Sequence, residues 1–123
     1  MSEYKRLPEA ELEVMQIIWA ADSPVTAAEV QQQAAKGWKS TSVLTFLARL
    51  TEKGFLRCEK EGRQNRYTPA VSREAYQHSE GPKVLQALFG GSVKKLVASL
   101  SEAGAVTEAD LDELRTYLES HRS

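Results

Sequence analysis

The stretch that decides the fold is WKSTSVLTFLARLTEKGF, residues 38–55. Ser40 or Thr41 can cap a helix that continues through Lys53, and Gly54 is suited to end it. Apolar residues recur within this stretch at helical spacing, on a face formed by Val43, Phe46, Leu47 and Leu50. We therefore expect the helix to bury one face in a core and to leave the other exposed.

The opposite face of this helix carries small side chains and one base: Thr41, Thr45 and Ala48, flanked by Ser42 and Arg49. Glu52 lies on this face too, but a full turn further along, where the groove should already be receding. A generic surface helix shows Glu and Lys more often on its solvent side. A low surface of hydroxyls can enter a major groove about 12 Å wide. The pattern predicts a DNA-recognition helix in which Thr41, Ser42 and Thr45 carry the sequence readout.

A β-hairpin is predicted directly after Gly54. Residues 55–60 and 65–68 are typical of two short strands around the turn Glu61-Gly62-Arg63-Gln64. Arg63 and Arg66 would project from the tip of this hairpin. Together with Lys53, and with Arg49 at the helix flank, we expect them to contact phosphates. Cys58 is expected to be a small packing residue that faces Tyr67 across the hairpin.

Two helices are predicted before the recognition helix. The first begins at Pro8 and ends near Ala20, with a buried stripe of apolar residues. Thr26 and Glu29 have the spacing of a capping box for a short second helix. Three helices followed by a hairpin form a winged helix-turn-helix. We assign this DNA-binding domain to residues 1–71 and expect it to have its own core.

The charge distribution agrees with this assignment. The whole chain carries a net charge of −1, but residues 36–66 contain eight bases and three acids. Because counterion release is local, such a basic segment can bind DNA within an acidic chain. The alternative is a solvated face whose charges merely alternate.

Residues 72–123 have a wholly helical pattern, which Gly81-Pro82 is expected to kink or interrupt. The pattern predicts three short helices with more apolar positions than one subunit can hide: Leu88, Phe89, Leu96, Leu100, Leu111, Leu114 and Leu118. A second copy would cover them, which makes this segment a dimerisation arm. The alternative is that they pack on the winged helix. The fold class is mainly α, with a small hairpin wing and a helical arm.

Several other classes are disfavoured. Cys58 is the only cysteine, and no apolar run approaches the length of a membrane span, so we expect a cytoplasmic protein without membrane insertion. His78 and His121 lie far apart, which disfavours a metal site, and no motif suggests an enzyme or a cofactor. The remaining rival is a winged helix used for protein–protein contact, whose third helix would carry an apolar or acidic outer face.

The chain resembles the penicillinase-repressor (BlaI/MecI/CopY) family. The resemblance is carried by Trp38 with the segments at residues 42–45, 47–50 and 53–54, and by the wing segments 61–63 and 67–69. Residues 11–15 with Trp19, and Phe89-Gly90-Gly91-Ser92 in the arm, extend it over nearly the whole chain. The resemblance implies a homodimeric repressor of antibiotic- or stress-response genes, bound to a palindromic operator in double-stranded DNA. It also implies release by a regulatory protease linked to a membrane sensor.

Two departures from the family limit what carries over. In the β-lactam branch the protease cuts an Asn-Phe bond, and the aligned residues here are Ser99 and Leu100. This weighs against regulation by that protease. The copper-responsive branch has a cysteine-rich C-terminal motif, whereas this chain has no cysteine after Cys58. A copper sensor of that type is excluded.

Overall fold

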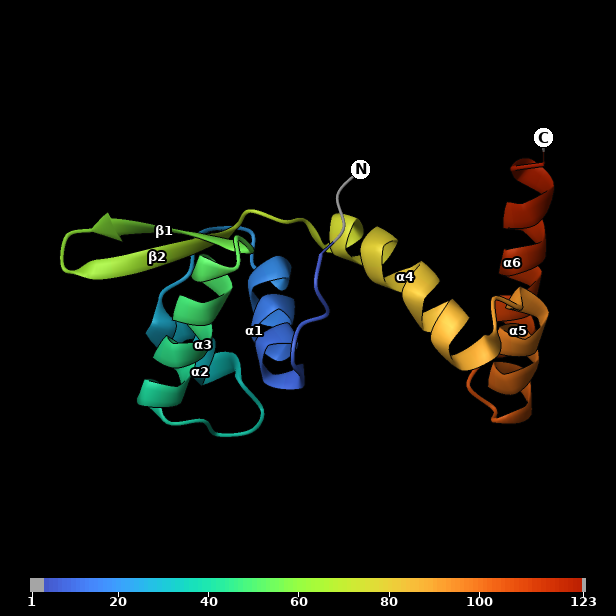
Figure 1. The fold of residues 1–123 in the computed structure, drawn as a ribbon, viewed down its shortest axis with the longest axis horizontal. Coiled ribbons are helices and arrows are strands. Elements are labelled where there is room, and N and C mark those ends of the chain that lie inside the picture. Colours follow the sequence, from blue (N-terminus) through green and yellow to red (C-terminus); the bar gives the residue numbers. More distant parts are fainter. Residues whose placement is uncertain (1–3, 123) are drawn as a thin grey trace. The chain divides into compact units, whose positions relative to one another are not determined.

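A computed structural model describes residues 4–122, which form two compact units (Figure 1). The first unit ends at Glu80 and contains α1 (Glu9–Ala20), α2 (Ala27–Gln33), α3 (Ser40–Glu52), β1 (Leu56–Glu61) and β2 (Gln64–Pro69). Helix α4 (Arg73–Phe89) continues into the second unit, which also holds α5 (Val93–Glu102) and α6 (Glu108–Ser120). No helix among these residues is long and apolar enough to cross a membrane. The expected fold class, a winged helix followed by helices, is confirmed.

The core of the first unit is built by the apolar stripes that the sequence predicts. Val43, Leu47 and Leu50 of α3 are completely buried, as are Val14 and Met15 of α1. Trp19 is half-buried, and its indole N–H donates to the Val71 carbonyl oxygen at 2.9 Å. Burial of these side chains fixes the face that α3 turns to the core, and therefore the face that it leaves open.

Helix α2 and the loop before α3 complete the helix-turn-helix. The predicted capping box is present: the Glu29 backbone N–H donates to the Thr26 hydroxyl, and the Thr26 N–H donates to the Glu29 carboxylate. Gly37 has φ +62°, which favours glycine, and lies in the loop between the end of α2 at Gln33 and the start of α3 at Ser40. Trp38 then packs edge-on against Phe46 with ring centroids 5.0 Å apart. The start of α3 is thereby held to its own second turn.

The hairpin is slightly longer than expected and pairs Glu61 with Gln64 around a two-residue turn. A third segment joins it, because Val25 and Tyr67 exchange two backbone hydrogen bonds of 3.1 and 2.8 Å. This bridge fixes the wing to the residues that precede α2. Cys58 pairs with Tyr67 as predicted, but it is exposed and does not pack in the core. The core ends at Leu56, so the outer strand residues extend beyond it.

Helix α4 differs from its prediction in two ways. It is not interrupted at Gly81-Pro82, where both residues are exposed and water can hydrate the carbonyl that proline leaves unpaired. Its first half belongs to the first unit: the Leu7 backbone N–H donates to the buried Tyr76 hydroxyl at 2.8 Å, and the Tyr4 N–H donates to Ser79 at 2.9 Å. The compact units therefore part after Glu80, whereas the sequence reading placed the boundary after Val71.

The second unit has well-capped helices but no interior. Ser92 caps α5, and Thr107 with Asp110 forms a capping box for α6. None of the residues from 81 to 122 is fully buried. Local signals therefore define these helices without the support of a core in the single chain.

Candidate DNA interface

The outer face of α3 is open in the structure. Thr41, Thr45, Ala48 and Arg49 are exposed, and Ser42 is half-buried at the edge of the face. With its side chains an α-helix is about 10–12 Å across, which fits a major groove about 12 Å wide. The helix can therefore present one continuous strip to a groove.

Thr45 does not offer a free hydroxyl. Its Oγ1 donates to the Thr41 carbonyl oxygen at 3.0 Å, so the hydroxyl proton is already used within the helix. Its oxygen can still accept a hydrogen bond, and its methyl group forms the rest of the exposed side chain. The Thr45 hydroxyl can therefore read a base only by accepting a hydrogen bond from it, and not by donating one.

Leu44 is an exposed apolar residue that the sequence reading missed. Its side chain is 49% exposed, and it is the sole exposed large apolar residue between positions 4 and 80. A signal was available, because Leu44 lies three residues after Thr41 and four before Ala48, on the same side of the helix. A leucine in an apolar-rich helix is more readily assigned to the core.

A shallow hollow of ≈250 Å³ connects α3 with the wing. It is lined by residues of α2 and the preceding cap, of α3 and of the hairpin: Thr26, Ala27, Ala28, Leu44, Arg63, Gln64, Asn65 and Tyr67. Leu44 therefore lies beside the hairpin tip. Burial raises the pKa of the Tyr67 hydroxyl, which remains protonated at neutral pH and serves as part of the wall.

The wing carries more bases than the two that were predicted. Arg63 is exposed in the turn, while the Arg66 Nε contacts the Glu61 carboxylate at 2.8 Å. Arg57 and Lys60 of β1 are also exposed, and the alternation of the strand could have indicated them. Arg66 must give up or share its carboxylate partner to contact a phosphate. Within the described residues 4–122, Arg63 forms no ion pair that it would have to exchange.

Lys53 has a structural partner within the domain. Its ammonium pairs with the Glu11 carboxylate of α1, and the Glu11 side chain is 3% exposed while that of Lys53 is 37% exposed. Lys36 contacts Glu9 at 3.0 Å and Glu13 at 3.6 Å, and these carboxylates raise its pKa. Carboxylates of α1 thus form ion pairs with one lysine before α3 and one lysine directly after it. Of the predicted phosphate contacts, Lys53 is the one most engaged elsewhere.

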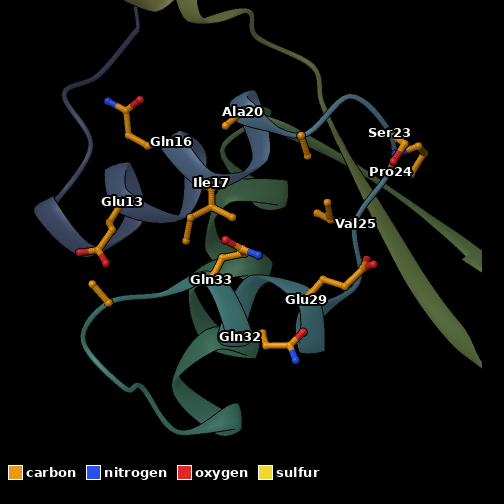
Figure 2. A pocket seen from close by; sticks show the side chains of 12 residues that line it. Glu13, Gln16, Ile17, Ala20, Ser23, Pro24, Val25, Glu29, Gln32 and Gln33 are labelled. Atoms are coloured by element: carbon orange, nitrogen blue, oxygen red, sulfur yellow. The ribbon is translucent and has the colours of Figure 1, made fainter.

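A larger hollow of ≈680 Å³ lies between α1 and α2 (Figure 2). Its lining contains Glu13, Glu29 and three glutamines but no basic side chain. Glu29 is committed to the capping box. The chemistry of this hollow does not suit DNA. Across the part of the chain that the structure describes, no group of three or more potential ligands could hold a metal ion.

The predicted dimerisation residues lie in the second unit, and none of them is buried. Leu88 is 72% exposed; Leu100, Leu114 and Leu118 are also exposed, while Phe89, Leu96 and Leu111 are half-buried. Val84, Val93 and Tyr117 add exposed apolar surface to this unit. Ser99 and Leu100, at the aligned cleavage position, lie on α5 and are exposed.

Comparison with known proteins assigns the chain to a family. The family model for the penicillinase repressor matches residues 7–120. A penicillinase repressor of Bacillus licheniformis is 30% identical, with all of this chain and 97% of that protein covered. The methicillin resistance regulatory protein MecI of Staphylococcus aureus is 28% identical, with 89% of each chain covered.

Solved structures agree with the sequence relatives. The DNA-binding domain of the repressor BlaI is 37% identical, with a TM-score of 0.53 over 62% of this chain and 94% of that one. The monomeric form of Bacillus licheniformis BlaI in complex with the blaP half-operator has the same identity and coverage and a TM-score of 0.51. The chain belongs to the penicillinase repressor family, a family of transcriptional repressors.

Proposed function

We propose that this chain is a DNA-binding transcriptional repressor whose α3 enters the major groove of an operator. The observation that carries the proposal is the open face of α3 with its small side chains, on a helix that shares a hollow with the basic wing through Leu44. The structure of BlaI with its half-operator, at 37% identity, supports the same use of the first unit here. The proposed contact residues are Thr41, Ser42, Thr45, Arg49, Arg63 and Arg66, with a lesser part for Lys53.

The repressor acts as a homodimer on a palindromic operator. Leu88, Leu114 and Leu118 expose apolar surface that a second copy of the arm would cover. Two recognition helices would then occupy half-sites about one DNA turn, or a multiple of it, apart. The target genes would be those of an antibiotic or stress response, and the names of the relatives, a penicillinase repressor and a methicillin resistance regulatory protein, support the antibiotic response. Such a protein would work in the cytoplasm.

A regulatory protease linked to a membrane sensor is a further candidate partner. Its target would be Ser99-Leu100, which is exposed but lies within α5. Proteases bind extended chain, so cleavage here would require local unfolding of α5. This helix lies in the unit without a buried core, where such unfolding costs least.

The direct test is a mobility shift of the full chain on DNA from upstream of its own gene, with unrelated DNA of equal length as control. We expect a shift at lower protein concentration on the upstream DNA, followed by protection of a twofold-symmetric site in a footprint. If neither DNA is shifted even at low salt, the winged helix serves a protein–protein contact and the proposal is wrong.

A further inference from the structure

Leu44 is the residue of the proposed interface that the small hydroxyl pattern does not explain. Neighbouring leucines in the first unit are buried, among them Leu47 and Leu50 on the same helix. Leu44 instead exposes about half of its surface on the outer side of α3, at the edge of the hollow beside the wing. An apolar side chain in that position needs an apolar partner when the face is covered.

The surroundings of Leu44 extend this apolar character. Ala48 is one helical turn further along the same side, and it is exposed. Thr45 is adjacent to Leu44, and its hydroxyl donates to the Thr41 carbonyl oxygen. Its methyl group remains available for an apolar contact. The three side chains form a strip of methyl groups along the outer face of α3.

The charged side chains around this strip indicate which kind of partner would cover it. Arg49 flanks it on α3, Arg63 lies with Leu44 at the same hollow, and Lys39 is exposed just before the helix. No acidic residue lines the hollow. A polyanion is therefore favoured over an apolar protein surface. In a major groove the apolar group on a base edge is the C5 methyl of thymine.

We infer that Leu44, with the methyl groups of Thr45 and Ala48, recognises thymine methyl groups in each operator half-site. This rests on the proposed function, because it requires α3 to lie in the major groove. It makes Leu44 a specificity-determining residue and predicts thymines at fixed positions under the first half of α3. Cytosine at those positions lacks the C5 methyl group and carries an amino donor where thymine has its O4 acceptor.

The test replaces thymine by deoxyuridine, which pairs identically but lacks the methyl group, at each thymine of the footprinted site in turn. The full chain is compared with Leu44→Ala and Leu44→Met. Burial of one methyl group corresponds to about fourfold in Kd. We expect about a fourfold loss at one or two positions of each half-site for the native chain. Leu44→Met should keep this discrimination. Leu44→Ala should bind the site more weakly and should lose the discrimination at the thymine that Leu44 contacts.

Leu88→Ala supplies a matched control, because it removes the same atoms from an exposed leucine of the arm. It should change binding to thymine and deoxyuridine DNA by the same factor. Circular dichroism would verify that Leu44→Ala keeps its helices, as expected for an exposed site. If the native chain binds its site tightly but every deoxyuridine is neutral, this inference fails and the proposed function stands. If no DNA is bound, the proposed function fails first.

Discussion

Substitutions of Thr45 can distinguish two ways in which α3 could contact bases, through the methyl group of this residue or through its hydroxyl. Its hydroxyl proton is held by the Thr41 carbonyl, so we expect the methyl group to matter more than the hydroxyl. Thr45→Val keeps the methyl and should reduce operator affinity less than about threefold. Thr45→Ser keeps the hydroxyl and should lose about fourfold, the value of one buried methyl group. Competition binding with operator and unrelated DNA measures both. The reverse order would assign the readout to the hydroxyl.

The ion pair between Lys53 and Glu11 should affect stability asymmetrically. Lys53→Met leaves the buried Glu11 carboxylate without its cation, whereas Glu11→Gln leaves Lys53 free to turn to water, because its side chain is 37% exposed. We expect Lys53→Met to lower the free energy of unfolding by about 2 to 3 kcal/mol and Glu11→Gln by about half as much. Urea unfolding measures the two values. Equal small losses would show that the pair is a surface contact and would return Lys53 to the phosphate contacts.

For single residues, the sequence predicts which side chains are exposed better than it predicts which side chains they contact. The exposure of Thr41, Thr45, Ala48 and Arg49 on α3 follows from helical spacing. Leu44 was missed because apolarity alone suggests burial. Lys53 looked free because its partner, Glu11, is 42 residues away in the chain. Long-range pairs of this kind depend on packing that no local pattern contains.

The wing is the element whose contribution to binding is best measured through salt. Each phosphate that a base neutralises contributes about −0.9 to the slope of log K against log salt concentration. Arg63→Ala should therefore reduce the slope by about 1 on any DNA. Arg66→Ala should reduce it less, because Glu61 already neutralises part of that charge. The control is Arg115→Ala in the arm, where Asp112 pairs with the base at 2.8 Å, and the slope should not change. Unchanged slopes for all three variants would remove the wing from the interface.

Element boundaries show where sequence signals succeed and where they fail. The capping box at Thr26 and the turn at Gly62 were readable because they depend on residues three or four positions apart. The continuation of α4 through Pro82 could not be predicted from local signals. It depends on whether water can reach the backbone carbonyl one turn earlier, which proline leaves without a hydrogen bond. The bridge between Val25 and Tyr67 could not be predicted either, because it joins two segments that are distant in sequence.

For the whole molecule, the boundary at Glu80 decides where the two functions can be separated. A chain ending at Val71 would lose Tyr76, which is buried, accepts from the Leu7 N–H and packs against Phe55 and Trp19 at centroid distances of 5.6 and 5.9 Å. Removing a buried aromatic side chain costs about 3 to 5 kcal/mol. A chain ending at Pro82 keeps these contacts. Thermal unfolding should therefore show residues 1–82 clearly more stable than residues 1–71.

Dimerisation is then expected to depend on the residues that a chain ending at Pro82 lacks. The full chain should be a dimer by light scattering at micromolar concentration, because Leu88, Leu114 and Leu118 have no cover within the single chain. Residues 1–82 should be monomeric and folded, in keeping with the separate structure of the BlaI DNA-binding domain. That fragment should bind one half-site and lose the effective concentration that links two half-sites in the dimer, which is worth a factor of about 100 or more in affinity. Leu88→Asn with Leu118→Asn in the full chain should reproduce the monomer without shortening it. A monomeric full chain, or a fragment that still dimerises, would place the interface outside the arm.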